Sequence, residues 1–198
     1  MAAESKETVV FDVHDFKVWA LVSDNSTDAS PTYASVAVDV PGIAEVGLDP
    51  NFVTAELKGD GKVIAKKGRV DRFNLSGTYG KLAQEVLKVI LGGTVLDGTA
   101  GKSRYRFKGR NSLPYWGCAF TIDDADIGQV RVILYKAQLT GGSLLSQSTE
   151  EFGQPSLEAE GIPCTSDDEL FFDVDFLDEA ETLTTSTTMA ELISAITA

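Results

Sequence analysis

Residues 52–66 read Phe-Val-Thr-Ala-Glu-Leu-Lys-Gly-Asp-Gly-Lys-Val-Ile-Ala-Lys. Two runs with strand character, 52–58 and 62–66, flank the triplet Gly59-Asp60-Gly61. An Asp-Gly pair between two such runs is a strong short-range signal for two antiparallel strands joined by a tight turn. The sequence therefore predicts an extended β-hairpin with its turn at this triplet.

Strand-like runs recur on both sides of this hairpin. They fall at 16–22, 33–40, 69–77, 104–108, 115–122, 129–137 and 170–176. One helix is expected at 79–91, and the helical spacing of apolar residues at 188–196 indicates a second helix with a weaker signal. The apolar positions of the first helix, at helical spacing, are Leu82, Val86, Val89 and Ile90. Many strands with one central helix predict a mainly β fold, a β-sandwich or barrel with one flanking α-helix, in a single domain spanning 1–198.

The composition limits the kinds of site that the chain can build. It has 198 residues, with 43% hydrophobic and 24% charged residues, as in ordinary folded proteins. His14 is the single histidine, so no site needing two imidazoles fits in one chain. Two cysteines are too few for a zinc ribbon or a disulfide scaffold. We expect Cys118 and Cys164 to be buried thiols.

Familiar catalytic and ligand motifs are incomplete in this chain. Residues 97–103 resemble the end of a phosphate-binding loop motif. The first glycine of that motif would fall at position 96, which is Leu96. Asp124, Asp126 and Gly128 lack the other ligands of a calcium loop. We therefore expect no enzyme activity, no cofactor and no metal site.

The N-terminal residues and the length of the apolar runs indicate where in the cell the protein is expected. The N-terminal residues lack a basic start followed by a long apolar run, which argues against a secretory signal. The longest apolar stretch, near 86–91, is far shorter than a membrane helix requires. We expect a protein that is made and kept in a cytoplasm, without membrane contact.

The net charge of −13 is unevenly distributed. Residues 1–99 carry 10 basic and 14 acidic side chains, and residues 100–137 carry 7 basic and 3 acidic ones. Residues 138–198 carry 13 acidic side chains and no Lys or Arg. Such a segment either extends into solvent or meets positive charge elsewhere.

The basic side chains of the middle segment alternate along the chain. They are Lys102, Arg104, Arg106, Lys108 and Arg110, interleaved with Ser103, Tyr105, Phe107 and Gly109. Because side chains alternate across a strand, this pattern predicts a strand with one basic face. Three interpretations stay open: pairing with the acidic C-terminal third, within one subunit or between subunits; a solvated face; or nucleic-acid binding with the aromatic residues.

The order of several landmarks within 38–94 resembles one family. They are Asp39-Val40-Pro41-Gly42-Ile43, Leu48-Asp49-Pro50, Glu56-Leu57-Lys58-Gly59-Asp60-Gly61, Val63-Ile64-Ala65, Tyr79-Gly80-Lys81-Leu82 and Ile90-Leu91-Gly92-Gly93-Thr94. This arrangement resembles the major tail tube protein of long-tailed (siphovirus-type) bacteriophages, particularly those of actinobacterial hosts. The later strands fit the family in pattern only.

The resemblance implies a β-sandwich or barrel whose subunits form hexameric rings, stacked into a hollow tube. A long hairpin, here around 40–67, would reach the next ring, and terminal arms at 1–15 and 178–198 would add contacts. Implied partners are the chain itself, the tape measure protein, and the tail terminator and tail-tip proteins. DNA would pass through without specific binding, in a virion tail assembled in the host cytoplasm.

Candidate contact residues follow from these patterns. Those expected between subunits are Lys58, Gly59, Asp60 and Gly61 of the hairpin, and Arg104, Arg106 and Lys108 of the basic strand. Asp173 and Asp175 would share one strand face, opposite Phe172, Val174 and Phe176, as an acidic lumen or pairing face. An acidic lining repels phosphate, which suits a conduit for DNA.

Two alternative functions stay open. The first is another β-rich phage structural protein, such as a head–tail connector, a decoration protein or an adhesion module. The second is a nucleic-acid-binding module that acts through 102–110.

Overall fold

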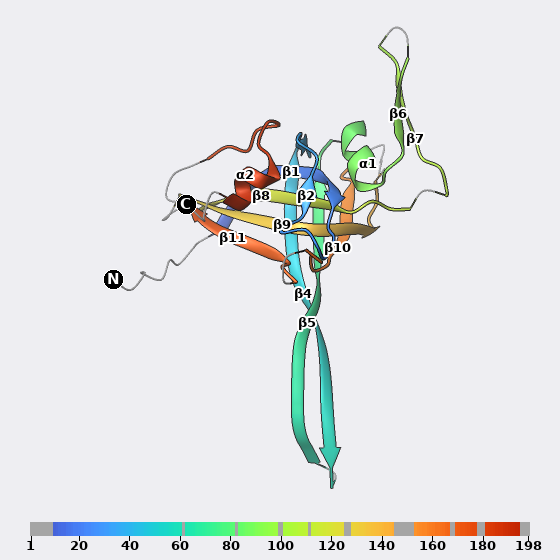
Figure 1. Ribbon diagram of the computed structural model, residues 1–198. Coiled ribbons are helices and arrows are strands. Elements are labelled where there is room, and N and C mark those ends of the chain that lie inside the picture. The colour runs from blue at the N-terminus through green and yellow to red at the C-terminus, as the bar shows by residue number, and fades with distance from the viewer. Residues whose placement is uncertain are drawn as a thin grey trace.

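Most of the chain forms β-strands. The computed structural model describes residues 10–60, 62–81, 83–98, 101–110, 112–124, 128–144, 153–166, 169–177 and 181–194. The strands are β1 (Val10–Ser23), β2 (Thr32–Tyr33), β3 (Val38–Asp39), β4 (Ile43–Gly59), β5 (Lys62–Tyr79), β6 (Thr94–Asp97), β7 (Ser103–Arg106), β8 (Trp116–Asp124), β9 (Gly128–Gly141), β10 (Ser156–Gly161) and β11 (Phe172–Leu177). The helices are α1 (Gln84–Ile90) and α2 (Met189–Ser194). The expected mainly β fold is confirmed (Figure 1).

Nine of these strands form one antiparallel sheet in the order β2-β1-β8-β9-β10-β5-β4, with β3 also paired to β1 and β11 to β9. Strand β9 pairs along one edge with β8. Its other edge is shared, because β11 pairs with 129–134 and β10 with 137–141. The strands β6 and β7 form a separate two-stranded hairpin.

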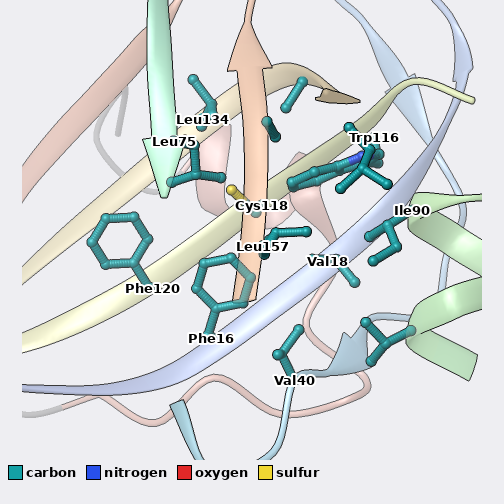
Figure 2. Close-up of a cluster of buried hydrophobic side chains, with 14 of the residues drawn as sticks. Phe16, Val18, Val40, Leu75, Ile90, Trp116, Cys118, Phe120, Leu134 and Leu157 are labelled. Carbon is teal, nitrogen blue, oxygen red and sulfur yellow. The ribbon is translucent and has the colours of Figure 1, made fainter. Parts of the chain in front are cut away.

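The sheet curls around a hydrophobic core, so that β4 contacts β1. The core draws on β1, β5, β8, β9 and β10, and α1 packs over it. Figure 2 shows Phe16, Trp116 and Leu157, which come from three different strands, in this cluster. Aromatic and aliphatic side chains at alternate strand positions thus give a barrel-like body with one helix beside it.

The opposite faces of β1, β8 and β9 are also buried. Trp19, Ala119 and Ile133 belong to a second cluster, which Leu183 and Met189 complete. The indole N–H of Trp19 donates to the carbonyl of Thr187 at 3.1 Å. The C-terminal segment with α2 therefore covers the outer side of the same three strands.

Helix α1 is shorter than the 79–91 expected from its apolar spacing. Tyr79 is instead the last residue of β5, where it is buried and pairs with Ile43. Val86, Leu87 and Ile90 supply the buried face, and the helix ends before Gly92, whose φ is +77°. Leu82 lies outside the described residues.

Helix α2 confirms the helix indicated by the amphipathic run at 188–196, although the helix spans only Met189–Ser194. Thr188 and Glu191 form a reciprocal capping box, in which the hydroxyl of Thr188 accepts from the N–H of Glu191, and the carboxylate of Glu191 accepts from the N–H of Thr188. The hydrogen bonds lower the pKa of Glu191.

Several strand boundaries differ from the sequence-based expectation. The run 33–40 splits into β2 and β3, and the runs from 52 to 77 belong to two long strands. Strands β6 and β10 were not expected, although 156–161 alternates buried Leu157 and Ala159 with outward-pointing Glu158 and Glu160. That alternation is a signal that could have identified β10.

The hairpin is the most extended feature of the molecule. Strands β4 and β5 pair from Ile43 and Tyr79 to Gly59 and Lys62. Asp60 adopts φ +48°, as a tight two-residue turn between the strands requires. The expected turn is confirmed at Gly59 and Asp60, while Gly61 lies outside the described residues. The distal half of the hairpin projects well away from the body (Figure 1).

A buried ion pair joins three distant segments of the body. Lys136 on β9 donates to the carboxylate of Asp24 at 2.5 Å, and the two side chains are 11% and 3% exposed. Asp24 also accepts from the N–H groups of Thr165 and Ser166 and from the Ser166 hydroxyl. Burial by itself would raise the pKa of Asp24, but these hydrogen bonds outweigh it and hold the pKa well below its usual value.

The substitution Asp24→Asn should lower the free energy of unfolding at pH 7 by about 3–5 kcal/mol, because it leaves Lys136 buried and unpaired. Since the pKa of Asp24 is lower in the folded state, its stabilisation is complete above about pH 4 and is lost as the pH falls further. Chemical denaturation at pH 7 and pH 3 measures both effects. Asp97→Asn, at an exposed position of β6, is the control, and equal losses in the two variants would contradict the prediction.

Candidate interaction surfaces

The distal hairpin, defined here as residues 52–69, is exposed throughout its described length. Several of the exposed large hydrophobic side chains of the described chain lie on it: Phe52 65%, Val53 47%, Leu57 62%, Val63 53% and Ile64 67%. Burying one such side chain would contribute roughly 1.5–3 kcal/mol, which the chain alone does not gain here. Large exposed apolar patches mark interaction sites.

The two faces of the distal hairpin differ in charge. The register places Val53, Ala55 and Leu57 of β4 beside Arg69, Lys67 and Ala65 of β5, respectively. This side, called the carboxylate-free face below, has a shallow hollow of about 240 Å³ lined by Val53, Ala55, Lys67, Gly68 and Arg69. On the opposite face, Glu56 binds Lys66 at 3.4 Å and Lys58 at 3.9 Å.

Of the candidate contact residues, those of the hairpin lie at its tip. Lys58 is exposed, and its amino group pairs with Glu56 of its own strand. Gly59 ends β4 and Asp60 forms the turn. They are therefore placed to reach a partner, which stays a prediction.

A second surface, called the acidic wall, lies where the same hairpin joins the body. It is the outer face of β4, β5 and β10, and its carboxylates are Glu45, Asp49, Glu158 and Glu160. Between them β5 presents the small polar side chains of Asn74, Ser76 and Thr78. The acidic residues themselves are evident in the sequence. Their common surface could not be predicted, because strand β10, which brings Glu158 and Glu160 beside β5, was not expected.

The acidic wall is poorly neutralised. Within the described part of this surface one cation, Arg72, contributes a guanidinium, which binds Asp71 at 2.9 Å and Glu160 at 3.0 Å. Glu45, Asp49 and Glu158 have no ion pair in the described part of the chain. The wall therefore presents a net negative surface, with a hollow of about 210 Å³ between Glu45 and Glu158.

The basic run forms a shorter strand than predicted. Strand β7 covers Ser103–Arg106, whereas Lys108 and Arg110 follow it outside the sheet. Tyr105 is partly buried, and its hydroxyl donates to the carbonyl of Gly92, with the Leu87 carbonyl 3.4 Å away. Burial raises the pKa of Tyr105. The β6–β7 hairpin projects away from the body on the side opposite the distal hairpin (Figure 1).

The cations of this run are exposed. Arg104, Arg106 and Lys108 form no ion pair with any carboxylate in the ranges that the structure describes. Asp167, Asp168, Asp178 and Glu179, which the pairing hypothesis included, lie outside those ranges. Pairing between subunits, solvation and nucleic-acid contact stay predictions for this hairpin.

Strand β11 places Asp173 and Asp175 on one face, as expected, but the burial of the two residues differs. Asp173 is exposed and accepts from the Tyr135 hydroxyl at 2.5 Å, but Asp175 is only 3% exposed. The opposite side of the strand is partly open, with Val174 38% and Phe176 42% exposed. The expected acidic lumen or pairing face is therefore not an open surface at Asp175, which rules this residue out of a lumen lining. The reason is that the C-terminal segment covers that side of the sheet.

Asp175 lies beside buried Arg131, its partner in the register with β9. Burial raises the pKa of Asp175, and the positive charge of Arg131 partly opposes the rise. Arg131 also donates to Glu181 at 3.1 Å. Asp175 thus lies beside a buried cation of its own chain that the sequence reasoning had not assigned to it, and the ion pair of that cation is with Glu181.

The described residues show no arrangement typical of a metal or catalytic site. None of their His, Cys, Asp and Glu side chains gather in groups of three or more that could hold a metal ion. His14 lies 3.7 Å from Asp123, while the neighbouring Asp15 accepts from the N–H of Leu183. Both cysteines are buried. No helix in this part of the chain is long and apolar enough to cross a membrane.

Comparison with known proteins gives little further information. No protein-family model and no curated protein matches the sequence. Among solved structures, the chain is similar to the tube-terminating cap of the anti-feeding prophage. The likeness covers 89% of this chain and 99% of that one, at 15% identity and a TM-score of 0.42. At this level the match supports no conclusion about function.

Reversing two exposed charges should leave folding intact. Arg104→Glu with Arg106→Glu should change the free energy of unfolding by less than about 0.5 kcal/mol, since neither side chain is buried or paired in the described structure. Tyr105→Ala, between them, should cost about 1–3 kcal/mol because it removes partly buried ring contacts. Denaturant titration compares the two variants. A charge-reversed chain that fails to fold would show that these arginines have partners within the subunit.

Proposed function

We propose that this protein is a structural component of a phage tail that assembles with copies of itself into stacked hexameric rings, forming the tail tube. The observation that carries the proposal is the distal hairpin, which projects from a well-packed body and exposes large apolar side chains. The sequence landmarks within 38–94, which resemble those of tail tube proteins, support the tail tube in particular. In this role the protein is not an enzyme and uses no cofactor or metal.

The energetics of the hairpin favour a partner. A two-stranded ribbon without a hydrophobic face against a core is marginally stable in water. Among the described strands β4 pairs only with β5, so its other edge offers backbone groups that invite further strands. Assembly would bury the apolar side chains and pair these groups, so a feature that is a liability in a monomer becomes useful in a polymer.

The acidic wall suits the lining of a channel for DNA. Glu45, Asp49 and Glu158 present unneutralised carboxylates beside short polar side chains, and phosphate groups are repelled by such a surface. We assign the lumen to this wall in place of Asp173 and Asp175. Passage without sticking is what a conduit for a genome needs.

The remaining partners follow from the same role. The tape measure protein would occupy the channel during assembly, and the tail terminator and tail-tip proteins would contact the two ends of the tube. The site of action would be the virion tail, assembled in the host cytoplasm.

Removal of the distal hairpin tests the assembly role. Phe52 and Val70 are direct partners in the register, so an Asn-Gly turn can replace 53–69 between them. Because the described side chains in this segment are exposed, the shortened chain should keep its thermal stability. Electron microscopy of concentrated protein, alone and with tail-tip proteins, should show tubes of uniform diameter for the intact chain and none for the shortened one. Tubes from the shortened chain, or none from the intact chain, would contradict the proposal.

Charge reversal on the acidic wall tests the channel lining. Assembled tubes of Glu45→Lys with Glu158→Lys should retain short double-stranded DNA at low salt, because two negative charges per subunit, which repel phosphate, are replaced by two positive charges, which attract it. Intact tubes should not retain it. Glu85→Lys with Asp97→Lys, at exposed positions of α1 and β6, is the matched control. Equal retention by the control would indicate that the acidic wall does not face the channel.

A further inference from the structure

The β6–β7 hairpin has one face that carries positive charge and no carboxylate. Arg104 pairs with Leu96 in the register of the two strands. Arg106 pairs with Thr94, so both guanidinium groups lie on the same face. Asp97 lies on the other face, which is the side of the hairpin that packs against α1. The outer face, called the cationic face below, therefore offers two arginines that no carboxylate of the hairpin neutralises.

Three carboxylates gather at one edge of the body. Asp12 of β1 and Asp123 of β8 are direct partners in the register, where like charges repel each other. Gln129 of β9 donates to Asp123 at 3.3 Å and accepts from the N–H of Glu181 at 2.8 Å, which brings the third carboxylate to the same place. Asp12 is exposed, and the side chains of Asp123 and Glu181 are 40% and 62% exposed. These three residues are called the acidic edge.

The acidic edge keeps most of its negative charge. Among the described residues, no exposed Lys or Arg forms an ion pair with it. Arg131 binds Glu181 at 3.1 Å, but the Arg131 side chain is 3% exposed and also lies beside the buried Asp175. A cation from outside the chain can therefore approach these carboxylates without displacing an exposed partner.

The cationic face and the acidic edge lie at opposite ends of the body. The β6–β7 hairpin packs against α1, whose Ile90 lies beside Trp116 at the start of β8 (Figure 2). Asp123 lies near the far end of the same strand, roughly 20–25 Å away. In Figure 1 the hairpin lies to the right of the body, whereas β9 begins at its left. Complementary surfaces at opposite ends of a subunit favour a head-to-tail contact, which closes into a ring when the rotation between subunits fits.

We propose that the cationic face of one copy binds the acidic edge of the next copy within a ring. This inference rests on the proposed self-assembly and names two surfaces that meet around each ring. The two guanidinium groups lie against the three carboxylates, so each copy donates at one end and accepts at the other. Such charge pairs fix the orientation of the subunits and speed their encounter more than they add affinity.

Other pairings fit these surfaces less well. The carboxylate-free face of the distal hairpin also carries cations, but they alternate with exposed apolar side chains that the acidic edge does not match. Nucleic acid is a less suitable occupant of the cationic face, because the net charge of the chain is −13 and repels phosphate at long range. The observations therefore favour a second copy.

Charge reversal at each surface tests this contact. The arginine variant carries Arg104→Glu with Arg106→Glu, and the aspartate variant carries Asp12→Lys with Asp123→Lys. Glu181 is left unchanged, because it binds the buried Arg131. Electron microscopy at low salt follows tube formation by each variant alone and by an equal mixture of the two with different tags. Thermal unfolding verifies that each variant is folded, and Asp12→Lys alone, at an exposed position, replaces an aspartate variant that is not.

Neither variant should form tubes alone, because its two meeting surfaces carry charge of the same sign. The equal mixture should form tubes that contain both tags, since every contact in a ring of alternating variants joins opposite charges and six subunits allow the alternation to close. A chain with all four substitutions should also assemble, because its two surfaces are complementary again.

Glu45→Lys with Glu158→Lys is the matched control, because it changes the net charge equally but lies on the acidic wall. It should assemble alone and should not bring the arginine variant into tubes. Tubes from the folded arginine variant alone, or none from the equal mixture, would overturn the contact and leave the proposed function intact. An arginine variant that assembles but loses the binding of short double-stranded DNA shown by the intact chain would overturn it in favour of nucleic acid. Failure of the intact chain to assemble would overturn the proposed function and the contact with it.

Discussion

The double burial of β9 is the constraint on which the rest of the structure depends. The strand pairs with β8 along one edge and with β11 and β10 along the other, and its side chains enter both hydrophobic clusters. Each neighbouring segment is positioned by reference to it. The second edge of β9 is shared between β11 and β10. This sharing positions the curl of the sheet, the C-terminal cover and the base of the long hairpin.

Sequence reasoning located the parts of the fold that are governed by local signals. The Asp-Gly turn at 59–61, the long apolar runs of β8 and β9, and both helices were predictable because turn chemistry and side-chain periodicity are local properties. The end of β5 was misjudged, since Tyr79 fits both the helical spacing and a buried strand position. Its pairing with Ile43 decides in favour of the strand.

The candidate surfaces were harder to predict because they depend on which segments become neighbours. Glu45 and Glu158 are far apart in the chain and share a surface only because β5 lies between their strands. Asp175 was expected on an acidic lumen or pairing face, but burial on a strand depends on what covers it, and here a later segment covers this residue. Lys58 and Asp60 lie exposed at the hairpin tip because their exposure follows from the turn itself, while their contact with another subunit stays a prediction.

The positions of the two tryptophans have a spectroscopic consequence. Trp19 and Trp116 are the only two in the chain, and both are fully buried, but they belong to opposite sides of the sheet. The Trp19 indole is hydrogen-bonded to the backbone of the C-terminal cover, whereas the Trp116 indole belongs to the barrel interior. Intrinsic fluorescence of single-tryptophan variants can thus distinguish local detachment of the cover from opening of the barrel, without any added label.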